Sequence, residues 1–306
     1  MNRTIENKRF GFTAVIVVIL IFGYFGSLQS EEDVITAEDL EDFPEDSLAT
    51  IIDSSGVVFE EDDTLYNSPE WWHRKVENRA WTVGESLKFV IRYGPIRAGT
   101  GTMSVKKIVD CGGHDTYHIV TTAQSAAFFS VFFKVDDRVE SYIDTEGIYT
   151  RRFEKHIREG GYKADKVTNF DQVNHLAITG KDTIKTYPFV QDILSAFYYA
   201  RTQDLEVGKP LFIDNHTDRK NYPLEVKVHR KQRVKTRAGT FNCILLEPVL
   251  RSSSIFENKG RLLVWVTDDQ YKMPVLMTSK VIIGHITTEL EWYRLPRIPD
   301  DWTKKD

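Results

Sequence analysis

Cysteine, histidine and aspartate are the residue types in this chain whose spacing could support chemistry. Cys111, His114 and His118 lie close together, and thiolate and imidazole are the usual protein ligands of zinc. The even separation of the two histidines places both on one face of a strand. A Cys-Gly-Gly turn followed by polar strand positions explains the same residues, and no second ligand cluster is visible. We therefore expect no metal ion and no cofactor.

The chain has two cysteines, Cys111 and Cys243, which exclude a disulfide-dense scaffold. In an oxidising compartment they could form one disulfide. A buried free thiol at Cys243, within a predicted strand, is the alternative, because cysteine is one of the most frequently buried residue types. The sequence leaves both possibilities open.

Carboxylate pairs are the next candidates, and they occur at Asp136-Asp137 and Asp268-Asp269. Adjacent residues of a strand point to opposite faces, so neither pair predicts a general acid/base dyad. Asp268-Asp269 is typical of a turn. The sequence contains no nucleophile elbow, zinc-binding helix motif or phosphate-binding loop. An enzyme would have to be a hydrolase that uses dispersed carboxylates, for example on glycans.

A basic stretch indicates a possible binding surface rather than a catalytic site. Six cations occur within eleven residues: Lys227, Arg230, Lys231, Arg233, Lys235 and Arg237. We expect no nucleic acid partner, because the protein is predicted to be exported. A solvated hairpin is one interpretation of this stretch. Contact with phosphate-bearing lipids, with polyanionic surface glycans or with the chain's own acidic segment is the other.

Aromatic residues suggest a second kind of site, inside the fold. A curved sheet with an inserted helix can enclose an apolar pocket, although ordinary core packing explains the same residues. If a pocket exists, we expect Phe197, Tyr198 and Trp265 to line it and Arg201 to provide a polar contact.

The elements that would position these residues are mostly strands. Alternating apolar and polar residues, bounded by glycine, proline or aspartate, predict many short strands. Residues 159–161 predict a hairpin turn. In contrast, Asp192–Arg201 has helical spacing with Asp192 as its N-cap, whereas 126–135 is ambiguous between strand and helix. The sequence predicts a mainly β fold: an antiparallel curved sheet, sandwich or open barrel, with one inserted helix near 190–203. The predicted strands are 87–93, 102–108, 117–122, 139–143, 148–158, 162–170, 224–236, 240–247, 261–267, 274–281 and 286–293.

The N-terminal region defines the compartment. Residues 10–30 carry no charge and could span about 30 Å as a helix, about one bilayer core. They could be an uncleaved anchor or a cleaved signal peptide. Arg3, Lys8 and Arg9 precede the apolar stretch and only acidic residues follow it closely, so the rest of the chain is predicted to be exported to the periplasm or secreted.

Charge is distributed unevenly along the 306 residues, whose net charge is −5. The segment 31–63 contains 14 acidic residues and no lysine or arginine, which predicts an extended linker. Removing this −14 and the +2 of residues 1–30 leaves a body of +7. The expected organisation is a signal or anchor, the acidic linker, a lead-in segment, the β-rich domain and a C-terminal tail: 1–30, 31–63, 64–83, 84–295 and 296–306.

Several motifs in this order resemble the exported bacterial family catalogued as domain of unknown function 3108. They are Gly84-Glu-Ser-Leu87, Tyr93–Gly99, Asp136–Asp144, Asp192–Arg201, Ala238–Cys243, Val264–Asp269 and Ile283–Ile286. The resemblance implies an exported β-rich domain. It implies no activity and no catalytic residues.

The sequence therefore predicts a non-enzymatic envelope protein that binds an apolar or amphipathic ligand, such as a lipid or glycan, or another envelope protein. The alternatives are an assembly or scaffolding factor and a glycan-acting hydrolase.

Overall fold

The computed structural model describes residues 74–131, 133–250, 262–280 and 285–296. The predicted anchor, the acidic linker, most of the lead-in segment and the C-terminal tail lie outside these residues. No helix within the described ranges is long and apolar enough to cross a membrane.

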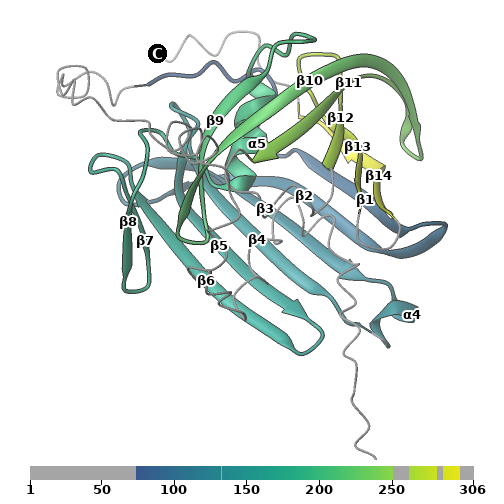
Figure 1. Cartoon of the computed structure of the whole chain (residues 1–306), viewed down its shortest axis with the longest axis horizontal. Helices are drawn as coiled ribbons and strands as arrows, with labels where there is room; N and C mark the ends of the chain where they lie inside the picture. The colour runs from purple at the N-terminus through teal and green to yellow at the C-terminus, as the bar shows by residue number, and fades with distance from the viewer. Residues whose placement is uncertain (1–73, 132, 251–261, 281–284, 297–306) are drawn as a thin grey trace, which may run out of the picture. The chain divides into compact units, whose positions relative to one another are not determined.

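The described strands form one antiparallel sheet of 14 strands (Figure 1), in the order β8-β7-β6-β5-β4-β3-β2-β1-β14-β13-β12-β11-β10-β9. The predicted mainly β, curved antiparallel fold is confirmed, and a single sheet rather than a two-sheet sandwich is formed. The strands are β1 Ser86–Tyr93, β2 Ile96–Asp110, β3 Asp115–Ser125, β4 Asp136–Asp144, β5 Thr150–Glu159, β6 Tyr162–Asp171, β7 Leu176–Thr179, β8 Asp182–Lys185, β9 Leu211–Thr217, β10 Lys220–Thr236, β11 Gly239–Leu250, β12 Leu262–Thr267, β13 Pro274–Lys280 and β14 His285–Arg294.

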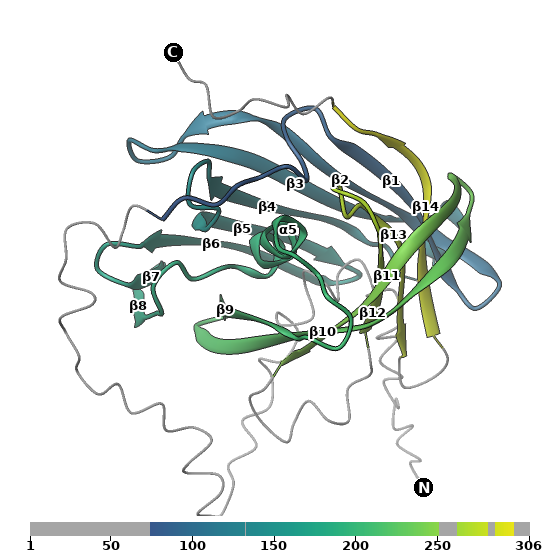
Figure 2. The ribbon, with the colours of Figure 1, turned by 90° about the horizontal axis from the view of Figure 1, so that it is seen from above.

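Two helices interrupt the strands. Helix α5, Ile193–Thr202, is the predicted inserted helix, and Asp192 is its N-cap as expected. The ambiguous stretch 126–135 contains the short helix α4, Ala127–Ser130. Figure 2 shows α5 inside the curve of the sheet, where Leu194 and Tyr198 are fully buried. The helix packs mainly against β4 and β9.

The sheet curves without closing into a barrel, and charged side chains join its two edges. Arg219 in the β9–β10 turn contacts Asp182 of β8 at 2.7 Å. The side-chain amide of Asn221 donates to the backbone carbonyl of Lys185 at 2.8 Å. Because β8 and β9 are not paired in the sheet, these side-chain contacts take the place of a strand ladder at this edge.

Close approach of two strands explains one glycine of the motif Tyr93–Gly99. A Cβ atom at Gly99 would lie 2.3 Å from the backbone oxygen of Gln124 in β3. Any side chain here would push β2 away from β3, and so would disturb the position of α4, which follows β3 directly.

Candidate functional site

The two predicted ligand contacts on α5, Tyr198 and Arg201, lie inside the protein core. Arg201 is 1% exposed and forms a two-point ion pair with Glu85, at 2.9 and 2.6 Å. Its guanidinium also donates to the backbone oxygen of Tyr271. Burial outweighs every other effect on Tyr198 and raises the pKa of its hydroxyl well above the ordinary value. Arg201 is therefore occupied by a buried partner and fixes α5 to the start of β1.

The N-terminus of α5 is fixed in the same way by Asp192, which is fully buried. One carboxylate oxygen accepts the backbone N–H groups of Leu194 and Ser195, as expected of an N-cap. The other oxygen accepts the hydroxyls of Ser141 at 2.6 Å and Thr150 at 2.8 Å. Two of the motifs that carry the family resemblance, Asp136–Asp144 and Asp192–Arg201, thus meet in a structural contact.

Of the other two predicted contacts, Phe197 lies beside Tyr198 on α5, whereas Trp265 lies on β12. Phe197 is partly buried, and its ring meets that of Tyr198 edge-on at 6.0 Å. Trp265 is 8% exposed and lies on β12, opposite Leu245 and Leu276. Its indole N–H has no hydrogen-bond partner among the described residues.

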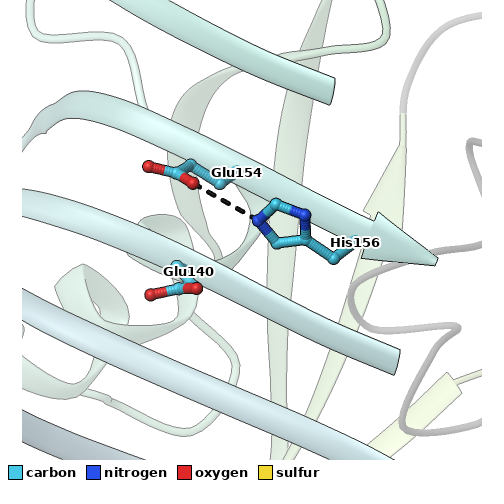
Figure 3. A group of neighbouring side chains, drawn as sticks. All are labelled: Glu140, Glu154 and His156. Carbon is cyan, nitrogen blue, oxygen red and sulfur yellow. Dashed lines mark hydrogen bonds and ion pairs between the residues drawn. The ribbon is translucent and has the colours of Figure 1, made fainter. Parts of the chain in front are cut away.

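The densest polar site lies on the outside of the sheet, and the sequence did not predict it. Ser141 of β4 faces α5, so the alternating residues of β4 point away from the helix. Figure 3 shows Glu140 on β4 beside Glu154 and His156 on β5, and Glu140 and Glu154 are direct partners across the strands. We call the whole set the outer network: His118, Arg138, Glu140, Tyr142, Arg152, Glu154, His156, Arg158 and Asp165.

Contacts within the outer network pair nearly every charge. Glu140 accepts from Arg138 and from His118, the latter at 2.5 Å. Glu154 accepts from Arg152 at 2.7 Å and contacts His156 at 3.3 Å. Arg158 donates to both oxygens of Asp165 at 2.8 Å, and His156 contacts one of them at 2.8 Å. The ring of Tyr142 lies between His118, stacked at 4.7 Å, and Arg152, at 5.9 Å.

These contacts set the protonation states. Burial acts to raise the pKa of Glu140, but hydrogen bonds from Arg138 and His118 outweigh it and hold the pKa below the ordinary value. Burial and the nearby Glu154 and Glu140 raise the pKa of Tyr142 to about 12. At neutral pH the network therefore holds an ionised Glu140 and a protonated Tyr142, so neither group is a general acid or base near neutral pH.

A metal ion could in principle be held by Glu140, Glu154 and His156, whose ligand atoms lie within 4.8 Å of one another. The charge of the surroundings argues against it. Three arginines, Arg138, Arg152 and Arg158, balance the three carboxylates of the outer network, and two of them contact Glu140 and Glu154 directly. A divalent cation would have to displace these two arginines, because they already neutralise the charge of the two glutamates.

A second carboxyl pair lies near the β5–β6 turn. Asp137, 3% exposed, accepts the backbone N–H of Arg158 at 2.6 Å through one oxygen, and its other oxygen has no hydrogen-bond partner among the described residues. Its carboxyl group lies near that of Glu159. Burial is the main cause that raises the pKa of Asp137 to about 6, and burial with the charge of Asp137 raises that of Glu159 to about 7. Asp136 is exposed, so adjacent aspartates do point to opposite faces as predicted.

This geometry does not suit glycoside hydrolysis. That reaction needs two carboxyl groups about 5–10 Å apart across a sugar site. Asp137 and Glu159 lie against each other near the β5–β6 turn, and Glu140 and Glu154 are neighbours across β4 and β5, each bonded to an arginine. Asp268-Asp269 forms a turn as expected: Asp269 accepts the backbone N–H groups of Tyr271 and Lys272.

The cysteine and histidine candidates are separated. Cys111 and Cys243 are both free thiols, and Cys243 is fully buried. His114 lies in the turn before β3 and contacts Arg151, whereas His118 belongs to the outer network. The prediction that the two histidines share a strand face is wrong, because β3 begins only at Asp115.

The basic stretch occupies β10 and its turn, and all six of its cations are exposed. Lys231 contacts Asp268 at 2.9 Å, and Arg237 contacts Glu289 at 3.9 Å. No ion pair is present within the described residues for Arg233 or Lys235, and their neighbours across the hairpin are the uncharged Asn242 and Thr240. The distal half of the hairpin therefore presents positive charge to solvent.

Comparison with known proteins identifies a family and several remote structures. A family model described as "Protein of unknown function (DUF3108)" matches residues 88–291. No curated protein matches the chain. A beta-barrel-like protein of the domain of unknown function DUF1849 from Brucella abortus is similar with a TM-score of 0.49 at 9% identity, over 71% of this chain and 100% of that protein.

Two further solved structures are less similar. A candidate lipoprotein from Parabacteroides distasonis has a TM-score of 0.34 and 11% identity, covering 72% of this chain and 99% of its own. A candidate exported protein with a YmcC-like fold from Bacteroides fragilis has a TM-score of 0.33 and 12% identity, with the same two coverages of 72% and 99%.

Proposed function

We propose that this chain, which belongs to the DUF3108 family of proteins of unknown function, is an exported cell-envelope protein that acts by binding, and that its ligand is a phosphate-bearing envelope polyanion held on the outside of the sheet. The observation that carries the proposal is the exposed cationic row on the distal half of the β10–β11 hairpin. We call Lys231, Arg233, Lys235 and Arg237 the basic row.

The compartment follows from the N-terminal sequence. An uncharged stretch at 10–30, with cations before it and acids after it, supports export of the body. Whether this stretch stays as an anchor or is cleaved as a signal peptide, the body of the chain reaches the same side of the membrane. A binding surface on the exported body would then meet lipid headgroups and glycans rather than nucleic acids.

Strand geometry supports the basic row as a surface for a linear polyanion. Val234 and Thr236 are buried, so Arg233, Lys235 and Arg237 share the opposite, exposed face of the hairpin. Alternate residues of a strand are about 7 Å apart, so these cations form a regular row along the hairpin. Arg233 and Lys235 face the uncharged Asn242 and Thr240 across the hairpin, so their charge has no local compensation among the described residues, whereas Lys231 and Arg237 each have a carboxylate partner.

An amphipathic ligand inside the curve is a second candidate function. The buried indole N–H of Trp265, which has no partner among the described residues, favours it, since a polar group of the ligand could accept this hydrogen bond and a buried donor without an acceptor is costly. In that case Phe197 and Trp265 would contact the ligand. Tyr198 and Arg201 would instead hold α5 in place. Native mass spectrometry of protein purified from membranes tests this version, and bare protein alone would contradict it.

The test of the polyanion proposal measures binding of the full chain to fluorescent inorganic polyphosphate by anisotropy. We expect binding that weakens steeply with salt, as counterion release requires. Arg233→Glu/Lys235→Glu should weaken it and lower the salt slope by about two. Lys106→Glu/Lys107→Glu makes the same change of charge on exposed residues of β2 and is the matched control. Equal losses in both variants, or no binding by the natural chain, would refute the proposal.

A further inference from the structure

Exposed apolar side chains gather at one end of the sheet. In an antiparallel sheet of consecutive strands, the β1–β2 turn, the β3–β4 connection and the β5–β6 turn lie at the same end (Figure 1). These connections expose Ile96 by 50%, Phe128 by 68%, Val131 by 81% and Tyr162 by 41%. We call these four residues the rim.

Backbone hydrogen bonds join the three connections into one surface. The N–H of Ala126 donates to the oxygen of Ala98 in β2 at 2.7 Å. On the other side, the N–H of Gly160 donates to the oxygen of Lys134 at 2.7 Å. A Cβ atom at Gly160 would lie 2.9 Å from the Phe133 ring, so the connection packs tightly on the β5–β6 turn. The rim residues are therefore neighbours in space.

Local hydrogen bonds fix α4 so that Phe129 packs against the core and Phe128 points outward. None of the four residues of α4 is buried. The hydroxyls of Ser125 and Ser130 bond to each other at 2.8 Å, and that of Ser125 accepts the backbone N–H of Val135 at 2.9 Å. Phe128 and Val131 are thus exposed on an ordered turn. Their burial would be favourable, because it would remove apolar surface from contact with water.

The charges beside the rim are mainly positive. Arg97, Lys134 and Lys163 are exposed next to rim residues, and the two lysines have no carboxylate partner in the described part of the chain. Of the nearby acids, Asp136 is held by Gln124 and Glu159 is half-buried against Asp137. Aromatic and aliphatic side chains flanked by lysine and arginine are the composition of surfaces that enter the headgroup region of a bilayer.

The turns at the opposite end of the sheet carry acidic side chains. They include Asp110, Asp115, Glu146 and Asp171. Val173, 58% exposed, is the large apolar side chain of the β6–β7 turn there. An anionic surface would therefore attract one end of the sheet and repel the other, which fixes the orientation of the domain.

We propose that the rim, with Arg97, Lys134 and Lys163, docks on the surface of an anionic phospholipid bilayer. Phe128 and Val131 would enter the acyl boundary, and the lysines would contact the headgroup phosphates. The partner of the rim is a lipid surface rather than a protein groove. The apolar groups are few and project from separate turns, and a fluid bilayer can accommodate such separate groups. The apolar side chains and the two lysines of this surface are not part of the basic row, so the two proposals can fail separately, although Arg97 and Arg237 both lie near Glu291.

The test places an environment-sensitive nitrobenzoxadiazole dye on the full chain at Val131→Cys, with Val173→Cys as the matched control at the other end. Cys111→Ser is included in both, and Cys243 stays because it is fully buried. Vesicles contain phosphatidylglycerol and phosphatidylcholine in equal parts, or phosphatidylcholine alone. We expect a blue shift and brighter emission for the probe at 131 on the anionic vesicles only, and a water-like probe at 173.

Charge variants test the headgroup contact. Each lysine beside an anionic surface strengthens association about fivefold, so Lys134→Gln/Lys163→Gln should lower the ratio of immersed to water-exposed probe about 25-fold. Lys106→Gln/Lys107→Gln, a pair of exposed lysines away from the rim, should leave that ratio unchanged. A water-like probe at 131 on vesicles that carry the protein, equal responses at 131 and 173, or failure of the full chain to bind vesicles would each overturn the proposal.

Discussion

The carboxyl pair of Asp137 and Glu159 should make the stability of the protein depend on pH. Both folded-state pKa values are raised, from 3.8 to about 6 and from 4.5 to about 7. A raised carboxyl pKa means that the folded state binds the proton more tightly than the unfolded state. The resulting stabilisation is complete below about pH 4 and is lost as the pH rises through 6 and 7.

Its magnitude follows from the shift at Glu159. Each tenfold change in proton affinity corresponds to 1.36 kcal/mol, so a rise from 4.5 to about 7 gives an upper limit of about 3 kcal/mol. The two shifts are not added, because the interaction between the carboxyl groups contributes to both. Partial exposure of Glu159 lowers the expected effect to about 2 kcal/mol.

The perturbation is Glu159→Gln, which keeps the shape, removes one charge and leaves an amide that can donate to Asp137. At pH 8 the variant should be more stable than the natural chain by about 2 kcal/mol, and at pH 4 this gain should vanish. Urea unfolding of both proteins at the two pH values measures it. The control is Asp136→Asn, which removes the exposed neighbouring charge and should change stability by less than about 0.5 kcal/mol. A stability difference between the variant and the natural chain that is the same at pH 4 and pH 8, or a Glu159→Gln variant that behaves like Asp136→Asn, would refute the reasoning.

Three further predictions concern the two buried anchors of α5 and the outer network. Arg201→Met leaves Glu85 buried without its partner, and urea unfolding should show a loss of about 3–5 kcal/mol; a loss below about 1 kcal/mol would contradict a buried ion pair. Asp192→Ala removes the N-cap and the acceptor of two buried hydroxyls and should cost about 3 kcal/mol in the same assay, whereas an unchanged midpoint would show that water replaces the carboxylate. Arg138→Gln/Arg152→Gln should create zinc binding measurable by calorimetry that the natural chain lacks, because it removes the charges that neutralise the carboxylates; strong zinc binding by the natural chain would show that the arginines do not exclude the ion.

The fold was largely predictable because its signals are local. Alternation of apolar and polar residues over six to twelve positions identified the long strands, and Asp192 before an apolar helical pattern identified α5. No comparable signal predicts β7 and β8. Each has only four residues, which is too few for alternation to stand out, and β9 was missed as well.

The candidate sites were less predictable because they depend on register. Glu140 and Glu154 are 14 positions apart and become neighbours only through the pairing of β4 with β5. Asp137 likewise finds its partner Glu159 on another strand rather than at Asp136. The hairpin turn predicted at 159–161 and strand alternation indicate these pairs only once the strands are aligned, since one residue of slip moves every side chain to the other face.

The open edge of the sheet is held by electrostatics instead of backbone pairing. Asp218 and Arg219 at the β9–β10 turn both have positive φ values, 44° and 66°, which side-chain-bearing residues adopt at a cost. Lys155 contacts Asp218 at 2.6 Å and Asp182 contacts Arg219 at 2.7 Å, so ion pairs offset that strain. Burial lowers the pKa of Lys155, but its contact with Asp218 opposes the shift and favours the charged form. The Lys155–Asp218 pair is largely buried and is screened little by salt, and it ties the β9–β10 turn to β5, whereas the Arg219–Asp182 pair at the edge itself is about half exposed. The surfaces proposed for binding, the basic row and the rim, therefore rest on a fixed frame, and changes in their charge should alter binding without opening the sheet.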